Sequence, residues 1–460
     1  MQNSQLAQLL KTLSPKEKRS FLRFLQSPWR GGQPELLRLA EHLLQPAGAE
    51  RREKTAAFPQ VFGPGKAYDD ARLRKTMEQL LRRLEHFLVL EQRETEPFDF
   101  RLRLASLLAE RKQERLWRRV AEAPLPFPAE ETDWTADTFD QAARWYRHRY
   151  DRHIAMRREH DPGLYALVTR YETIGLLARR LRNACIFLSN SKGKDALPSD
   201  PLLTWAEPTL SEYAGLPLLR TLFAGLRALQ QPGEPAHFIT FRDGLLAGHR
   251  YFTTAERRDL LLVAINFCSK RYNDGNPAWL DTQIDLYEYG LKEGLLLENN
   301  WVTGYTFTNI ATLALIARRY ERLAQLLREY RDKIAPRDRA GAAAFNEARL
   351  HYALRRYRPA LTLLQQNVFD DILLNLSAKI VQAKCFYELE EYALLDMHLE
   401  ALRKFIQRHR EVGYIGERYL NFVAVLRRMV RAAPGSKDGL RQEILALPVL
   451  AEKEWLLERL

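Results

Sequence analysis

Three histidines and an aspartate lie within one short stretch, and these residue types are common zinc ligands. His148, His153 and His160 stand near Asp151, with successive histidines five and seven residues apart. Those spacings do not place the three imidazoles on one tight helical face, and the chain has no H-E-x-x-H motif. We therefore predict no metal site here.

Two glycine-lysine pairs invite comparison with phosphate-binding loops. They lie in SNSKGKD, Ser189–Asp195, and FGPGKAY, Phe62–Tyr68. A phosphate loop requires G-x-x-x-x-G-K-[ST], whose backbone amides hold the phosphates and whose hydroxyl binds magnesium, and neither stretch has that spacing or that hydroxyl. The G-x-S-x-G elbow of serine hydrolases is also missing. We therefore expect a protein that is not an enzyme and carries no cofactor.

Arginines and aromatic residues alternate in the stretch QAARWYRHRYDRHIAMRREH. Residues 141–190 hold ten arginines against four acids, and the chain as a whole has a net charge of +13. Arginines that contact phosphates and aromatic rings that stack on bases form nucleic-acid grooves. The candidate residues are Arg144, Arg147, Arg158, Trp145 and Tyr150. The alternative is an amphipathic helix with buried rings and solvated arginines, which we favour because no nucleic-acid-binding motif accompanies the charge.

The compartment is predicted from cysteines and hydropathy. Cys185, Cys268 and Cys385 are far apart and each lies in an apolar run, a pattern typical of buried thiols in a reducing environment. The N-terminus has no signal-peptide pattern, and no stretch approaches the ~18 apolar residues of a membrane span. We expect a cytoplasmic protein with no membrane contact.

The spacing of apolar residues along most of the chain is helical, so helices must position the residues described above. Within residues 70–92 an apolar stripe recurs at helical spacing, formed by Leu73, Met77, Leu80, Leu84, Phe87 and Leu88. Ser14-Pro15-Lys16-Glu17 is a capping-box helix start. Hairpin signals are scarce. Residues 121–140 hold six acids, no lysine or arginine, and three prolines within five residues, which predicts a linker. The fold class is therefore all-α.

A repeat occupies the C-terminal half of the sequence. The tyrosines of ARRYERLAQLL, LRRYRPALTLL and LEEYALLDMHL stand at 320, 357 and 392, spaced 357 − 320 = 37 and 392 − 357 = 35 residues apart. Nine residues before each tyrosine is an alanine: Ala311, Ala348 and Ala383. A small residue lets two antiparallel helices approach, and a tyrosine fills the wedge at their turn. Each repeat is therefore predicted to be a helical hairpin.

The period and these residue types resemble the tetratricopeptide repeat. LSPKEKRSFLRFLQSPW, FGPGKAYDDARLRKTMEQLLRRLEHFL and ALRKFIQRHREVGYIGERYLNFVAVLRRMV are further similar to an uncharacterised bacterial family of all-helical tetratricopeptide-like proteins. That resemblance implies a right-handed α-solenoid behind an N-terminal helical module. The expected segments are an N-terminal helical module (1–95), a connecting helix with the acidic linker (96–140), degenerate helical pairs with the basic face (141–300), repeats (301–410) and a C-terminal helical cap (411–460). Among the degenerate pairs we expect helices at 256–272 and 278–293, and in the cap we expect helices at 414–431 and 438–460.

Solenoids bind partners on the surface formed by the first helices of successive repeats. We therefore predict a non-enzymatic interaction scaffold that holds a partner peptide or helix in this groove. The groove residues expected from the repeat alignment are Asn309, Thr312, Asn346, Arg349, Gln382 and Lys384. The alternative function is nucleic-acid binding through residues 141–190.

Overall fold

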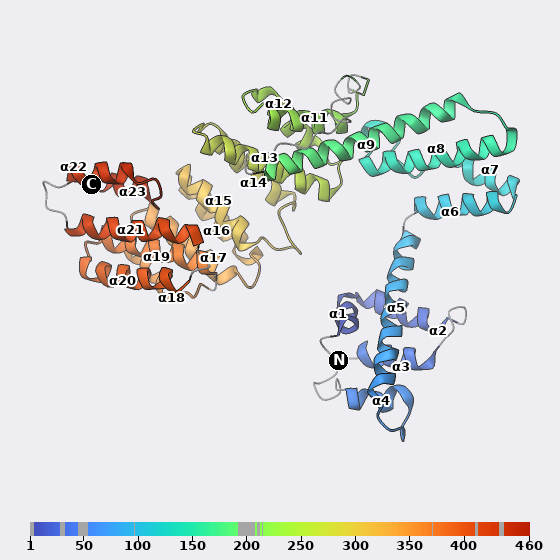
Figure 1. Cartoon of the computed structure of the whole chain (residues 1–460), viewed down its shortest axis with the longest axis horizontal. Coiled ribbons are helices and arrows are strands. Elements are labelled where there is room, and N and C mark those ends of the chain that lie inside the picture. Colours follow the sequence, from blue (N-terminus) through green and yellow to red (C-terminus); the bar gives the residue numbers. More distant parts are fainter. Residues whose placement is uncertain are drawn as a thin grey trace. The chain divides into compact units, whose positions relative to one another are not determined.

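The computed structural model describes residues 4–27, 33–44, 54–95, 97–191, 208, 212–213, 215–369, 371–409, 413–431 and 437–460 (Figure 1). The prediction of an all-α chain is confirmed for these residues, which contain helices and no β-strand. Two isolated β-bridges join Glu298 to Trp301 and Val302 to Ile334. None of the helices in the described ranges is long and apolar enough to cross a membrane.

The chain divides into two compact units. Unit 1 comprises residues 1–129 and 138–173, and unit 2 comprises residues 130–137 and 174–460. The helices that begin in the first of these stretches are α1 (Gln5–Thr12), α2 (Pro15–Gln26), α3 (Pro34–Leu44), α4 (Lys54–Phe62), α5 (Asp70–Thr95), α6 (Pro97–Glu110) and α7 (Glu114–Glu122). Next come α8 (Ala136–Arg157) and α9 (Pro162–Asn190), and α9 begins in unit 1 and continues into unit 2.

The N-terminal core is built around α5. Leu73, Leu80 and Leu84 of the predicted stripe are fully buried in one apolar cluster with residues of α1 to α4. At the start of α2, the Ser14 hydroxyl accepts from the Glu17 amide and the Glu17 carboxylate accepts from the Ser14 amide. Periodicity and capping therefore specify this core from sequence alone.

The predicted linker, residues 121–140, is free of α-helix only from 123 to 135, because α8 already begins at Ala136. Between the end of α7 at Glu122 and the start of α8 at Ala136, the chain forms a single 3-10 turn, η3 (Glu131–Asp133). Proline lacks the amide hydrogen that a helix interior requires, so the three prolines at 124, 126 and 128 prevent α7 from continuing.

Unit 2 consists of consecutive helices that pack in pairs (Figure 1). These are α11 (Pro217–Gln230), α12 (Pro235–Ala247), α13 (Thr254–Asn273), α14 (Trp279–Lys292), α15 (Gly304–Ile316), α16 (Tyr320–Tyr330), η4 (Arg331–Lys333), α17 (Arg339–Ala353), α18 (Tyr357–Gln366), α19 (Ile372–Glu388), α20 (Tyr392–Arg408), α21 (Gly413–Arg431), α22 (Lys437–Ala446) and α23 (Lys453–Glu458). The predicted pair at 256–272 and 278–293 is α13 with α14, which contact each other.

The repeat predicted from sequence coincides with three of these pairs. Tyr320, Tyr357 and Tyr392 are the first residues of α16, α18 and α20. The three aligned alanines are buried in the preceding helices α15, α17 and α19. Side chains three residues after each tyrosine are also buried, which are Leu323, Ala360 and Leu395.

One turn geometry joins the helices of all three pairs. The residue two before each tyrosine has positive φ, at 55° for Arg318, 60° for Arg355 and 58° for Glu390. The next amide donates to a carbonyl of the first helix, from Arg319 to Ala314 at 2.8 Å, from Arg356 to His351 at 2.8 Å and from Glu391 to Phe386 at 3.0 Å. This left-handed cap satisfies the last carbonyls of each first helix.

The C-terminal cap differs from its prediction. One continuous helix was expected over 438–460, but the chain forms two, α22 and α23. Pro448 lies between them, and Glu452, just before α23, has a positive φ of 55°. Because proline cannot continue a helix and positive φ redirects the chain, the segment turns before α23.

Candidate functional site

The aromatic part of the predicted nucleic-acid face is wrong at Trp145. Its side chain is 1% exposed and packs with Phe98 of α6 and the guanidinium of Arg101, so it cannot stack on a base. Tyr150 is partly buried, and its hydroxyl lies 2.8 Å from the His160 Nδ1. The rings of α8 are mostly packing residues, because this helix is amphipathic.

The predicted arginines do not form one uniform face. Arg144 pairs with Asp99 at 3.0 Å and Arg147 pairs with Glu172 at 2.9 Å, each about half exposed. Arg158 lies beyond the end of α8, where its φ of 55° takes it out of the helix. Two of the three predicted phosphate contacts therefore already have carboxylate partners.

The histidines beside these arginines have other contacts. Trp117 Nε1 donates to His148 Nε2 at 3.1 Å, and burial lowers the pKa of His148. Across the parts of the chain that the structure describes, no three His, Cys, Asp or Glu side chains are grouped so that they could hold a metal ion. The cysteines are buried as predicted, and burial raises the pKa of each to about 12. Such thiols are poor nucleophiles at neutral pH.

Three of the predicted groove residues meet along α15 and α17, and a fourth, Lys384, lies on α19 with its ammonium 4.9 Å from the Tyr352 ring centroid. The Arg349 guanidinium donates to the Thr312 hydroxyl at 2.8 Å and to the Asn346 Oδ1 at 3.3 Å. Asn346 Nδ2 donates to the Thr308 hydroxyl at 3.1 Å, and Lys384 extends the row onto α19. We name this surface the first-helix face, defined by Thr308, Thr312, Arg349, Tyr352, Lys384 and Glu388.

Two groove predictions require correction. Asn346 is fully buried, because its amide links α15 to α17 and donates to the Ala342 carbonyl, so it cannot touch a partner. Gln382 lies on another side of α19, where its Nε2 donates to the Leu364 carbonyl of α18 at 3.1 Å. Gln382 and Lys384 lie on different sides of α19, since residues two apart in a helix do not share a face. Asn309, the remaining predicted groove residue, is partly buried and hydrogen-bonded to Tyr287 of α14.

The first-helix face is covered in part by the chain's own α23 and by the residues that flank it, Glu452 before the helix and Arg459 after it. Lys384 Nζ donates to Glu452 Oε2 at 2.6 Å, and Arg459 Nε donates to Glu388 Oε1 at 2.7 Å. Between these two ion pairs, Trp455 Nε1 donates to the Tyr352 hydroxyl at 2.6 Å. Charge pairs thus bracket a central indole on this face.

Aromatic packing surrounds that indole. The Trp455 ring lies 5.3 Å from the Tyr387 ring in an edge-to-face arrangement, and the Lys384 ammonium is 4.9 Å from the Tyr352 ring centroid. Trp455 and Leu456 are buried in the same apolar cluster as α17 and α19 residues. Aromatic and cation-π contacts of this kind each add about 0.5–1.5 kcal/mol beyond burial.

The electrostatics of the face follow from burial. Burial lowers the pKa of Arg349 to about 10, and Glu452 opposes this by favouring the charged guanidinium. Burial also raises the pKa of Tyr352, and the adjacent Glu388 carboxylate adds to the effect. The tyrosine is therefore a neutral hydrogen-bond donor to Glu388, at 3.0 Å. Arg459 supplies the cation beside Glu388, and Glu452 supplies the anion beside Lys384.

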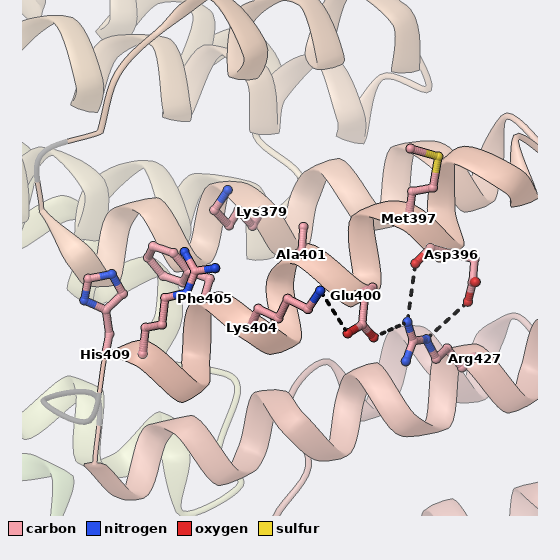
Figure 2. Close-up of a pocket in the computed structure, with 10 residues that line it drawn as sticks. Lys379, Asp396, Met397, Glu400, Ala401, Lys404, Phe405, His409 and Arg427 are labelled. Atoms are coloured by element: carbon pink, nitrogen blue, oxygen red, sulfur yellow. Dashed lines mark hydrogen bonds and ion pairs between the residues drawn. The ribbon is translucent and has the colours of Figure 1, made fainter.

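A second feature is a surface hollow of about 710 Å³ formed by α19, α20 and α21. Figure 2 shows Glu400 between Lys404 and Arg427, with Arg427 also reaching Asp396. Hydrogen bonds from Arg403 and Arg427 lower the pKa of Glu400 to about 2. This network joins α20 to α21. At the other end of the hollow the Phe405 ring packs against His409, with ring centroids 4.5 Å apart.

Sequence reasoning missed the residues that complete the first-helix face. Tyr352 and Glu388 lie one helical turn beyond the predicted Arg349 and Lys384. Extending the predicted face by one turn along each first helix would have included them. Glu452, Trp455, Leu456 and Arg459 stand at positions i, i+3, i+4 and i+7, the spacing of a helix that anchors in a groove. This spacing was the available signal in the C-terminal cap.

Comparisons with known proteins add no identification. The chain matches no protein family, no curated protein and no solved structure.

Proposed function

We propose that this chain is a non-enzymatic protein-interaction scaffold of the tetratricopeptide-like class, built as a right-handed solenoid and acting in the cytoplasm. The partner is a peptide or helix that binds on the first-helix face. The observation that carries this proposal is the seating of α23 there, through the Lys384–Glu452 and Glu388–Arg459 pairs and the Tyr352–Trp455 hydrogen bond. A surface that holds one helical segment has the chemistry to hold another.

The shape of the contact supports the same proposal. Protein interfaces place aromatic anchors at a desolvated centre and charged residues at a wetter rim. Trp455 is 7% exposed at the centre, whereas the side chains of Glu452 and Arg459 are 37% and 31% exposed at the edges. On α15, Tyr305 is 79% exposed and stands seven residues, about two helical turns, before Thr312. This aromatic is available to a partner that extends past α23.

The second candidate function is nucleic-acid binding, favoured by the ten arginines between residues 141 and 190. Phosphate contacts release counterions, so this function requires affinity that falls steeply with salt, by about 0.9 in the log–log slope per contact. The buried Trp145 and the paired Arg144 and Arg147 weigh against it.

Affinity capture with the full chain separates the two functions. The tagged protein is incubated with extract of its native cell, with and without nuclease, beside the variant Arg144→Gln, Arg147→Gln, Arg158→Gln. A protein scaffold retains the same protein partner after nuclease treatment and in the triple variant. Loss of the captured material on nuclease treatment, with a shallower salt slope for duplex DNA in the triple variant, would instead support the nucleic-acid function.

A further inference from the structure

The contact between α23 and the first-helix face has the composition of an interface rather than of a permanent core. Two of the four anchors of the segment, Glu452 and Arg459, are charged and reach oppositely charged side chains on α19, which are Lys384 and Glu388. The other two anchors, Trp455 and Leu456, are buried at 7% and 0% exposed, and Leu450 and Ala451 just before the segment are buried with them. A small apolar centre inside a polar rim is typical of surfaces that associate and separate.

The face beneath the segment is also suited to binding when uncovered. It presents Tyr352, Arg349, the Lys384 ammonium and the Glu388 carboxylate, and Tyr387 lies beside it with its ring 5.3 Å from that of Trp455. Tyrosine and arginine are enriched at the energetically dominant positions of protein interfaces. The unusual positive φ of Glu452, a non-glycine residue, gives the bound segment a local cost that its release removes.

We propose that α23 is an internal occupant of the first-helix face, and that the partner is an amphipathic helix of the same chemistry. Such a helix carries a carboxylate at position i, tryptophan at i+3, leucine at i+4 and a guanidinium or ammonium at i+7. By analogy with Glu452, Trp455 and Arg459, the carboxylate meets Lys384, the indole meets Tyr352, and the cation meets Glu388. The partner binds by displacing α23. This inference rests on the proposed function, because it names the partner class of that same face.

A tethered segment competes at an effective concentration near the millimolar range, so an external helix binds weakly until the internal one is loosened. The probe is a labelled synthetic peptide of residues 449–460, VLAEKEWLLERL. We expect it to bind the full chain carrying Glu452→Ala and Arg459→Ala at least about tenfold more tightly than the unaltered chain. Circular dichroism and melting curves check that the double variant is folded.

A charge exchange tests the pairing itself. The peptide carrying Glu452→Lys should bind the double-variant chain several-fold more weakly, and adding Lys384→Glu to that chain should recover part of the loss. The matched control is a peptide carrying Glu454→Ala, since Glu454 is an exposed acid on the same helix and its loss should leave affinity unchanged. Equal binding of all three peptides by the double-variant chain would overturn the assignment of these contacts.

A measurement on the unaltered full chain needs no substitution. If α23 opens on its own, its backbone amides exchange with solvent faster than those of α19. Equal exchange rates in the two helices, together with no peptide binding by the double variant, would make α23 a permanent part of the fold and overturn the proposal. Failure of the proposed function appears separately, as nuclease-sensitive capture while the peptide still binds.

Discussion

Arg318, Arg355 and Glu390 occupy the left-handed turn position of the three repeats, a conformation that favours glycine. Each has a Cβ that crowds the following carbonyl in this region, at a cost of about 1–2 kcal/mol. Because arginine or glutamate stands where glycine would be expected, the residue type at this position does not predict the turn. The tyrosine that follows two residues later does, because it begins the next helix in all three pairs.

Arg355→Gly should stabilise unit 2, because glycine adopts positive φ without that crowding. The gain is about 0.5–1 kcal/mol after the greater flexibility of glycine in the unfolded chain is subtracted. Urea unfolding measures it. Arg356→Gly is the matched control, since Arg356 is an exposed neighbour with φ of −94°, and that change should not stabilise. Equal effects from the two substitutions would mean that positive φ carries no cost here.

Tyr357→Ala tests the packing role of the repeat tyrosine. A fully buried ring would cost about 3–5 kcal/mol on truncation. Tyr357 is partly buried, with its ring 5.4 Å from the Tyr352 ring and its hydroxyl 3.4 Å from Glu388, so we expect a loss of about 1–3 kcal/mol. A melting temperature equal to that of the unaltered chain would refute the packing role.

His398 on α20 gives a pH dependence. Burial lowers its pKa, while its Nε2 lies 2.8 Å from the Lys379 carbonyl. Between this lowered pKa and the unfolded value of about 6.5, the unfolded chain binds more protons, so stability falls as the pH drops through this window. Unfolding free energies at pH 7.5 and 5.5 should differ less in His398→Gln than in the unaltered chain. His249→Gln, at an exposed site, should leave the difference unchanged.

At the scale of elements, hydropathy patterns predicted the helices and the alanine-tyrosine spacing predicted three helical hairpins. The same turn also joins α6 to α7, where Lys112 has φ of 56° and the Gln113 amide donates to the Leu108 carbonyl, but Glu114 replaces the tyrosine and hides the relationship. Contacts across elements were harder to predict. The seating of α23 on α17 and α19 joins residues about a hundred positions apart, such as Tyr352 and Trp455.

The close packing of α11 against α12 depends on two glycines that no periodicity rule identifies. A Cβ at Gly244 of α12 would overlap the Thr221 side chain of α11, and one at Gly225 would lie 2.9 Å from the Phe241 ring. Gly244→Ala should therefore destabilise unit 2 by about 1–3 kcal/mol, the usual cost of overpacking. Gly233→Ala, with open space at its Cβ, is the control for thermal unfolding. Equal losses would argue against close packing.

At the scale of the whole molecule, the chain joins an all-helical N-terminal unit to a longer series of helix pairs. The chain has a net charge of +13. Many of its arginines nevertheless have carboxylate partners, such as Arg144, Arg322 and Arg427. Net charge therefore reports less about function than the placement of a few groups on the first-helix face. That face could be located from the repeat alignment, whereas its occupant could be found only from the folded chain.

Site-specific crosslinking tests whether the first-helix face is the surface that binds the partner. A photoreactive p-benzoylphenylalanine replaces Tyr305 on α15 in one full-length variant and Tyr392, an exposed tyrosine at the start of α20, in the other. In the native cell, we expect a discrete, nuclease-resistant protein crosslink from position 305 and none from position 392. Equal crosslinking from both positions, or products that disappear with nuclease, would contradict it.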